Sequence, residues 1–225
     1  MGGETFLGSP GNWSRVASFK TFRLPGGEKT SREAWRVAAA LCWQSNIIFE
    51  MSDRPIHELK MVWENKINCP ESSAAGRLFS AAAVLLNLVE NETFEGHGPM
   101  LLESLAETTL AKEITLPFIE ENGVSLIDWK PLIMMLKDES ISIAYRARCF
   151  HETMADCISR ISLQYNNEFK NISIGLSGGV FQNQLLVRLI RERLDKHHLK
   201  IILPASIPVN DGGLSAWQII ENYYQ

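Results

Sequence analysis

A glycine-rich segment near the C-terminal end of the chain is the first candidate for chemistry. Ser177-Gly178-Gly179-Val180 follows alternating apolar residues that predict a strand, and it precedes an apolar pattern that predicts a helix. Glycines let the backbone approach a ligand closely, and a helix N-terminus offers unpaired N–H groups to an anion. The segment is therefore either a phosphate-binding turn or a plain tight turn, and the local pattern leaves both interpretations open.

The segment departs from two known types of phosphate-binding loop. A Walker A loop needs Gly-Lys-Ser/Thr, which does not follow here. ATP pyrophosphatases carry a Ser-Gly-Gly-x-Asp-Ser loop, but Phe181 and Gln182 stand where its Asp and Ser would be. Neither loop type is favoured.

Asn210-Asp211-Gly212-Gly213 is the second candidate. Glycines after Asp211 expose its carboxylate at a strand end, and such a carboxylate can bind a hard cation. The alternative is an aspartate that acts as a turn residue or helix cap, which is commoner for an isolated Asn-Asp-Gly.

Histidine and cysteine spacings indicate no metal site of their own. The five histidines contain no pair at i, i+4, and the four cysteines contain no Cys-x-x-Cys. His151 is expected to be packed within a helix, and His197 and His198 to be solvated near a helix end. Free thiols without a signal peptide fit a reducing cytoplasm.

The bulk composition is that of a soluble globular protein. The chain has 225 residues, 45% hydrophobic and 21% charged, with a net charge of −4, and its length fits one large domain or one and a half ordinary ones. We expect no nucleic-acid partner, because no basic stripe is present, and Arg191 and Arg193 are expected on a solvated helix face. We expect no membrane partner, because no apolar run is long enough to span a bilayer.

The elements that must position these candidates fall into three regions. Residues 1–30 are expected to form strands and turns, residues 31–165 a largely helical part, and residues 166–225 a β-α-β-α lobe whose two strands pair in parallel. Thr30 and Glu33 have the spacing of a capping box. The predicted elements are strands at Thr5–Leu7, Val16–Phe22, Val124–Trp129, 172–176 and Ile201–Leu203, turns at Ser9–Asn12 and Pro208–Gly213, helices beginning at Thr30, Pro55 and Pro99, and helices at Ser73–Asn87, Ala144–Ile161, Asn183–Lys196 and Leu214–Asn222.

Taken in order, these segments resemble one family, the HypF-type carbamoyltransferases that act in hydrogenase maturation. Each motif alone is weak, but the ordered set covers nearly the whole chain. The matching segments are Gly2-Gly3-Glu4, Arg15–Ala17, Leu24–Glu28, Gly76–Phe79, Phe94–Gly96, Arg148–Met154, Gly175–Asn183 and Pro208–Gly213.

The resemblance implies a fold and an activity. The fold would be a mixed α/β, actin/Hsp70-like ATPase (ribonuclease H-like) fold, related to the tRNA threonylcarbamoyladenosine synthases and incomplete here. The activity would be carbamoyl transfer from carbamoyl-adenylate, made from carbamoyl phosphate and ATP, to the C-terminal cysteine of a HypE-type partner. The cofactors would be ATP or carbamoyl-adenylate and a divalent metal, Mg, Fe or Zn.

The resemblance also assigns residues. Asp211 would be a metal ligand, Gly178, Gly179 and Asn183 would line the nucleotide, and Gly96 would approach its ribose or adenine side. No catalytic residue follows from it.

Two departures from the family pattern bear on activity. Ser80 stands where the family carries an aspartate that contacts the nucleoside, so a charge-assisted bond of roughly 1–2 kcal/mol is lost. The family's two-histidine metal motif and its Asp-Gly-Thr-Gly loop precede Trp-Gly-Gly-Glu, where this chain begins, with Met1 in place of Trp. We therefore expect a C-terminal part that acts with a polypeptide carrying the remaining domains. The alternative is a non-catalytic remnant that binds nucleotide weakly or serves as an interaction module.

Overall fold

Strands from two distant parts of the chain form the largest sheet of this computed structural model, which describes residues 2–169, 172–204 and 206–223. Its order is β1-β2-β6-β5, and its strands are β1 (Glu4–Ser9), β2 (Asn12–Phe19), β5 (Phe118–Glu121) and β6 (Val124–Ile127). β2 and β6 pair in parallel, and the two outer pairs are antiparallel. The first and second predicted regions therefore share a sheet.

Tight turns set the register of the two hairpins in this sheet. The β5–β6 turn has positive φ at both Asn122 (52°) and Gly123 (77°), as a type I′ turn requires. The β1–β2 turn places Gly11 at a φ of 78°. A residue without a Cβ tolerates this backbone at little cost.

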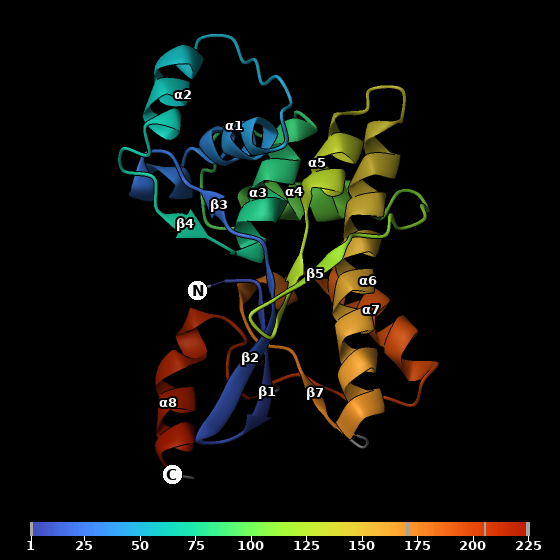
Figure 1. Cartoon of the computed structure of the whole chain (residues 1–225). Coiled ribbons are helices and arrows are strands. Elements are labelled where there is room, and N and C mark those ends of the chain that lie inside the picture. Colours follow the sequence, from blue (N-terminus) through green and yellow to red (C-terminus); the bar gives the residue numbers. More distant parts are fainter. Residues whose placement is uncertain (1, 170–171, 205, 224–225) are drawn as a thin grey trace.

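Five helices gather at one end of the molecule, at the top of Figure 1. They are α1 (Ala34–Gln44), α2 (Ile56–Glu64), α3 (Ala75–Leu85), α4 (His97–Ala106) and α5 (Lys130–Lys137), joined in part through a 3-10 turn (Gly27–Ser31) and the short pair β3 (Phe22–Arg23) and β4 (Glu71–Ser72). Small residues let α1 and α3 approach closely, because Ala38–Ala40 and Ala81–Ala83 are fully buried.

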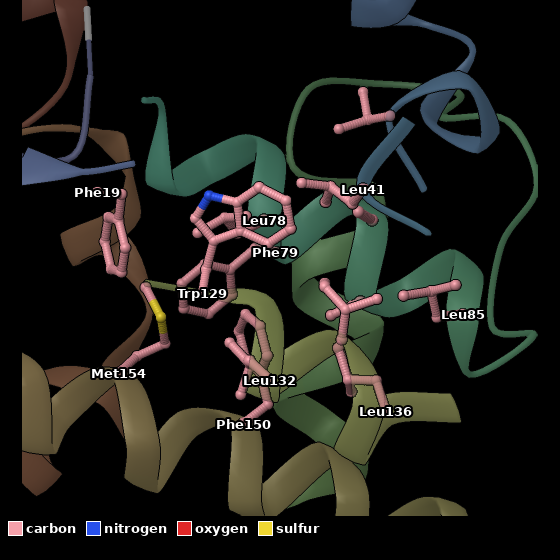
Figure 2. Close-up of a cluster of buried hydrophobic side chains, with 14 of the residues drawn as sticks. Phe19, Leu41, Leu78, Phe79, Leu85, Trp129, Leu132, Leu136, Phe150 and Met154 are labelled. Carbon is pink, nitrogen blue, oxygen red and sulfur yellow. The ribbon is translucent and has the colours of Figure 1, made fainter. Parts of the chain in front are cut away.

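The main core lies between these helices and the long helix α6 (Ile143–Phe169), as Figure 2 shows. Phe79 of α3 and Phe150 of α6 form an edge-to-face pair with ring centroids 4.8 Å apart. Phe19 brings the end of β2 to this cluster, and Trp129 donates from its indole to the Lys20 carbonyl oxygen at 2.8 Å. The sheet and the helices are thus anchored to one another.

The C-terminal lobe completes the chain. Its elements are β7 (Ile174–Gly175), a 3-10 turn (Gly179–Gln182), α7 (Gln184–Asp195), β8 (Ile201–Ile202), a 3-10 turn (Asp211–Gly213) and α8 (Leu214–Tyr223). β7 and β8 pair in parallel, which confirms the predicted β-α-β-α unit. α7 packs along α6, and α8 lies beside the β1–β2 hairpin (Figure 1).

The mixed α/β class is confirmed, and several boundaries are corrected. The predicted capping box is wrong, because Thr30 lies in a 3-10 turn and its hydroxyl donates to the Gly27 carbonyl, so α1 begins only at Ala34. The strand predicted to reach Phe22 ends at Phe19, and α6 continues two turns beyond Ile161.

Other elements differ in their starting point or were missed. α4 begins at His97, ahead of Pro99, because Gly96 takes the left-handed N-cap conformation. Helix α5 and strands β4 and β5 were not predicted. None of the helices that the structure describes has both the length and the apolarity to cross a lipid bilayer.

Candidate functional site

The two glycine-rich segments lie against each other at the ends of β7 and β8. The Gly178 N–H donates to the Val209 carbonyl oxygen at 2.7 Å. A Cβ built on Gly179 would lie 3.9 Å from the Asn210 Cβ. Parallel pairing explains this contact, since the carboxyl ends of neighbouring parallel strands meet at one edge of a sheet. The structure therefore brings Asp211 next to the Gly178-Gly179 turn.

Gly178 has a backbone that favours glycine. Its φ of 114° and ψ of 156° lie where L side chains are strained. No described atom comes within 4 Å of the position that its Cβ would take. The glycine is thus required by its backbone angle rather than by crowding, and the turn presents bare backbone to open space.

The prediction that the glycine turn leads directly into the N-terminus of a helix is wrong. A 3-10 turn lies between them, and Phe181 N–H donates to the Gly178 carbonyl at 3.0 Å, which leaves the N–H groups of Gly179 and Val180 as the first unsatisfied donors of that turn. A phosphate would meet these two groups before it could reach α7.

The N-terminus of α7 is already capped by protein groups. Asn183 Oδ1 accepts from Leu186 N–H at 2.7 Å, and Glu103 Oε1 accepts from Leu185 N–H at 3.0 Å. A carboxylate at a helix N-terminus also interacts favourably with the helix dipole. The α7 N-terminus therefore does not offer a free anion site.

Asn183 also holds α7 to α6. Its amide nitrogen donates to Nε2 of His151 at 3.0 Å, and His151 Nδ1 donates to the Ala147 carbonyl at 2.9 Å. Burial lowers the pKa of His151 from 6.5 to about 4, so the ring is neutral. His151 is packed, as predicted. Both ends of the Asn183 amide are engaged within the protein, and its nucleotide contact stays a prediction.

A partly buried charge network also joins α6 and α7, and the sequence analysis did not predict it. Glu152 accepts from Arg148 Nε at 2.9 Å and from an Arg193 guanidinium nitrogen at 2.6 Å. Arg193 also pairs with Glu113 at 3.2 Å. The prediction of a solvated Arg193 is therefore wrong. The i, i+4 spacing of Arg148 and Glu152 was the one local signal of this network.

Asp211 is an exposed carboxylate within a short 3-10 turn. Asn210 Oδ1 caps that turn by accepting from Gly212 N–H at 3.1 Å. Across the residues that the structure describes, no group of three His, Cys, Asp or Glu side chains is arranged to hold a metal ion. A divalent metal at Asp211 would need further ligands from elsewhere, because one carboxylate does not make a tight site.

Helix α3 contacts the glycine turn near its start and the beginning of α4 further along, and it carries Ser80 between these two contacts. A Cβ on Gly76 would lie 3.7 Å from Val180, and Ser80 follows Gly76 by one helical turn on the same face. Further along, a Cβ on Gly98 would lie 3.1 Å from Ala83. Ser80, which is buried, thus lies on the α3 face that runs from the turn to the start of α4.

Gly96 presents another open backbone position. It has a φ of 84°, and no described atom lies within 4 Å of its Cβ position. Its distance along α4 from Glu103, which touches α7, is about 10 Å at 1.5 Å per residue. Gly96 is therefore about two turns of α4 away from the contact between Glu103 and Leu185, and its nucleotide contact stays a prediction.

Two surface hollows lie away from this site. Their volumes are about 490 and 360 Å³, and both are lined by Glu50, Met51 and Asn87. The second includes Arg146, whose guanidinium donates to the Leu136 carbonyl at 2.7 Å near the end of α5. A cation is favoured at a helix C-terminus, so this arginine is explained by the fold.

Comparisons with known proteins define the class. The model of the family "Carbamoyltransferase, Kae1-like Domain, second subdomain" matches residues 1–218. The fold and these matched residues place the protein among the carbamoyltransferases with a Kae1-like domain. The chain belongs to the HypF carbamoyltransferase family.

Relatives and solved structures agree with this assignment. Carbamoyltransferase HypF of Rhodobacter capsulatus is 31% identical over 97% of this chain, and Carbamoyltransferase HypF2 of Cupriavidus necator is 28% identical over 97% of it. A crystal structure of full-length HypF in the phosphate- and nucleotide-bound form matches 98% of this chain with a TM-score of 0.87 at 24% identity. The structure of T. kodakarensis HypF matches 94% with a TM-score of 0.80 at 25% identity.

The chain spans only part of these relatives. It covers 29% of the Rhodobacter protein, 31% of HypF2 and 30% of each crystal structure's chain. A HypF homolog of Cupriavidus necator is covered to 59%. Met1, predicted to stand in place of the family's tryptophan, lies outside the described residues.

Proposed function

We propose that this chain supplies the nucleotide-contacting C-terminal part of a carbamoyl-transfer site. The observation that supports the proposal is the 2.7 Å bond between Gly178 N–H and the Val209 carbonyl, which brings the glycine turn against the segment that leads to Asp211. The N–H groups of Gly179 and Val180 suit a phosphate of ATP or carbamoyl-adenylate. A relative whose crystal structure is nucleotide-bound shares the fold.

The proposed reaction transfers a carbamoyl group to the C-terminal cysteine of a HypE-type partner. The cysteine thiolate attacks the carbamoyl carbon of carbamoyl-adenylate, a C–S bond forms, and the C–O bond to AMP breaks. AMP leaves with the electron pair of that bond. The backbone amides of this chain would orient the AMP phosphate, and the reaction would take place in the cytoplasm.

A divalent metal does not fit the described residues alone. Asp211 provides one carboxylate, and Mg²⁺, Fe²⁺ and Zn²⁺ all require more ligands than that. A polypeptide with the remaining HypF domains would have to supply them. No step of the transfer is therefore assigned to a metal.

Isothermal titration with ATP and Mg²⁺ tests the proposal. We expect a Kd no tighter than about 1 mM for the chain alone, near −4 kcal/mol. Adding the part of Cupriavidus necator HypF2 that precedes its match to this chain should tighten the Kd at least tenfold. Gly178→Ala should abolish the tightening. Gly123→Ala is the control, because Gly123 also has a positive φ, 77°, but lies in the β5–β6 turn.

A non-catalytic nucleotide-binding or interaction module is the second candidate function. Ser80 in place of the family's aspartate and the solitary Asp211 favour it. It predicts that the HypF2 part leaves the Kd for ATP unchanged. Micromolar binding by the chain alone would contradict the need for a second part.

A further inference from the structure

The ring of His151 is fixed by packing as well as by hydrogen bonds. It is fully buried, and two aromatic rings meet it edge to face, Phe79 with centroids 5.4 Å apart and Phe150 with centroids 5.9 Å apart. Phe79 lies on α3 three residues after Gly76, whose Cβ position is 3.7 Å from Val180 of the glycine turn. The ring is therefore held in one orientation where α3, α6 and α7 meet.

Two backbone groups determine the direction of the hydrogen bond between His151 and Asn183. The Ala147 carbonyl can only accept, so in the neutral ring Nδ1 carries the proton and Nε2 is a bare acceptor. The Leu186 N–H can only donate, so Asn183 turns its Oδ1 towards Leu186 and its amide nitrogen towards the ring. The other tautomer, or a flipped amide, would set donor against donor or acceptor against acceptor in this buried contact.

The amide nitrogen of Asn183 has a second hydrogen that the protein does not use. An amide nitrogen carries two hydrogens, and the bond to His151 takes one of them. Asn183 is only 8% exposed, yet among the described residues no other group accepts from this nitrogen. A buried donor without an acceptor is costly. Asn183 also ends the 3-10 turn, where its own N–H donates to the Val180 carbonyl at 3.2 Å, so the unused hydrogen belongs to the same turn as the free N–H groups of Gly179 and Val180.

We infer that His151 is a positioning residue of the nucleotide site: it holds the Asn183 amide so that the second N–H donates to an acceptor atom of the bound nucleotide. The inference rests on the proposed function, and it adds one side-chain donor to the two backbone donors of the turn. Three donors suit a group that only accepts, either a phosphate oxygen or an unprotonated ring nitrogen of the base. His151 acts through Asn183, because its own ring is fully buried.

Nuclear magnetic resonance of the isotopically labelled chain tests the inference. AMP at about 20 mM exceeds a millimolar Kd, so it should shift the backbone amide signals of Gly179 and Val180 and, with the same concentration dependence, the side-chain amide signal of Asn183. Asn183→Asp identifies that signal by its loss, since aspartate caps a helix as well as asparagine does. Inorganic phosphate in place of AMP distinguishes the two acceptors, because it supplies phosphate oxygens without a base.

Two substitutions of His151 separate positioning from packing. His151→Phe fills the volume of the ring without an acceptor, so the AMP-induced shift should be lost at Asn183 and kept at Gly179 and Val180. His151→Gln offers its side-chain oxygen to the Asn183 amide, so it should retain the Asn183 shift. His197→Phe changes an exposed histidine and should behave as the parent chain. Circular dichroism shows whether each variant is folded.

The inference is overturned if AMP shifts Gly179 and Val180 without Asn183, or if His151→Phe keeps the Asn183 shift. It is also overturned if His151→Gln and His151→Phe lose that shift alike, because packing would then be the cause. If AMP shifts none of the three residues, the proposed function is wrong for this turn and the inference falls with it. Should His151→Phe not fold, the parent chain and His151→Gln decide.

Discussion

The Asn183 amide nitrogen and His151 Nε2 meet at 3.0 Å across a buried contact between α7 and α6. The bond fixes the ring of His151 in the tautomer that carries its proton on Nδ1, since that atom donates to the Ala147 carbonyl. The same asparagine caps α7 immediately after the glycine turn. The position of the turn therefore depends on a buried polar contact with α6.

Asn183→Ala should destabilise the fold by about 2 kcal/mol or more. The change removes a helix cap, which costs roughly 1 kcal/mol, and leaves the buried Nε2 of His151 without its donor, which costs about 1–3 kcal/mol. Urea unfolding measures the loss. Asn210→Ala is the control, because it caps only a three-residue turn. Equal losses for the two variants would contradict the role of the Asn183–His151 bond.

Stability should fall as the pH falls from 6.5 towards 4. Burial lowers the pKa of His151 to about 4, so in this window the unfolded chain binds a proton that the folded chain does not. The contribution of His151 to the free energy of unfolding is present above pH 6.5 and is lost as the pH falls from 6.5 towards 4. Between pH 7 and pH 5 it amounts to about 2 kcal/mol.

His151→Gln tests this pH dependence. In urea titrations at both pH values, the variant should lose about 2 kcal/mol less than the parent chain between pH 7 and pH 5. His197→Gln changes an exposed histidine and should keep the parent slope. If His151→Gln lost as much free energy of unfolding between pH 7 and pH 5 as the parent chain, other groups would be the cause of the pH dependence.

Gly178→Ala should reduce the free energy of unfolding by about 1–3 kcal/mol, because its φ of 114° strains any L side chain. Gly179→Ala is the matched control. Its added Cβ would sit at an ordinary van der Waals distance, 3.9 Å, from Asn210. Thermal or urea unfolding compares them, and a control as destabilised as Gly178→Ala would argue for crowding instead of strain.

Glu152→Gln should destabilise the protein by about 3 kcal/mol, since it leaves Arg148 and Arg193 partly buried with one charge partner fewer. Glu107→Gln removes a half-exposed partner of Arg188 at 2.7 Å and should change stability by less than about 1 kcal/mol. Urea unfolding at constant pH gives both values. If the two changes were alike, the network would be no stronger than a surface pair.

Local patterns were sufficient for the elements with strong periodicity. Apolar residues three or four apart predicted α7 nearly in full and α6 as far as Ile161, two turns short of its end, and alternation predicted β7. The hairpin β5–β6 carries a local signal of its own, since Asn122-Gly123 is typical of a type I′ turn. The capping box at Thr30 failed because its hydroxyl closes a 3-10 turn instead.

Long-range contacts were beyond the sequence. Arg193 pairs with Glu113, 80 positions away, and with Glu152, 41 positions away, and no local pattern predicts either contact. The approach of the two glycine-rich segments follows from parallel pairing of the strands before them. The contact of Glu103 with the N-terminus of α7 does not follow from any local pattern, since Glu103 and Leu185 are 82 positions apart. A motif shows which groups exist, and packing decides which of them stay available.

The parallel pairing of β2 with β6 has a consequence for how the chain folds during synthesis. The ion pair between Lys20 and Asp128 at this junction spans 108 positions. At about 5–20 residues per second, the ribosome needs roughly 5–20 s to deliver the second strand after the first. Through that interval the β1–β2 hairpin lacks its partner β6, and Phe19 lacks the later helices that bury it, so this sheet can close only late in the synthesis of the segment.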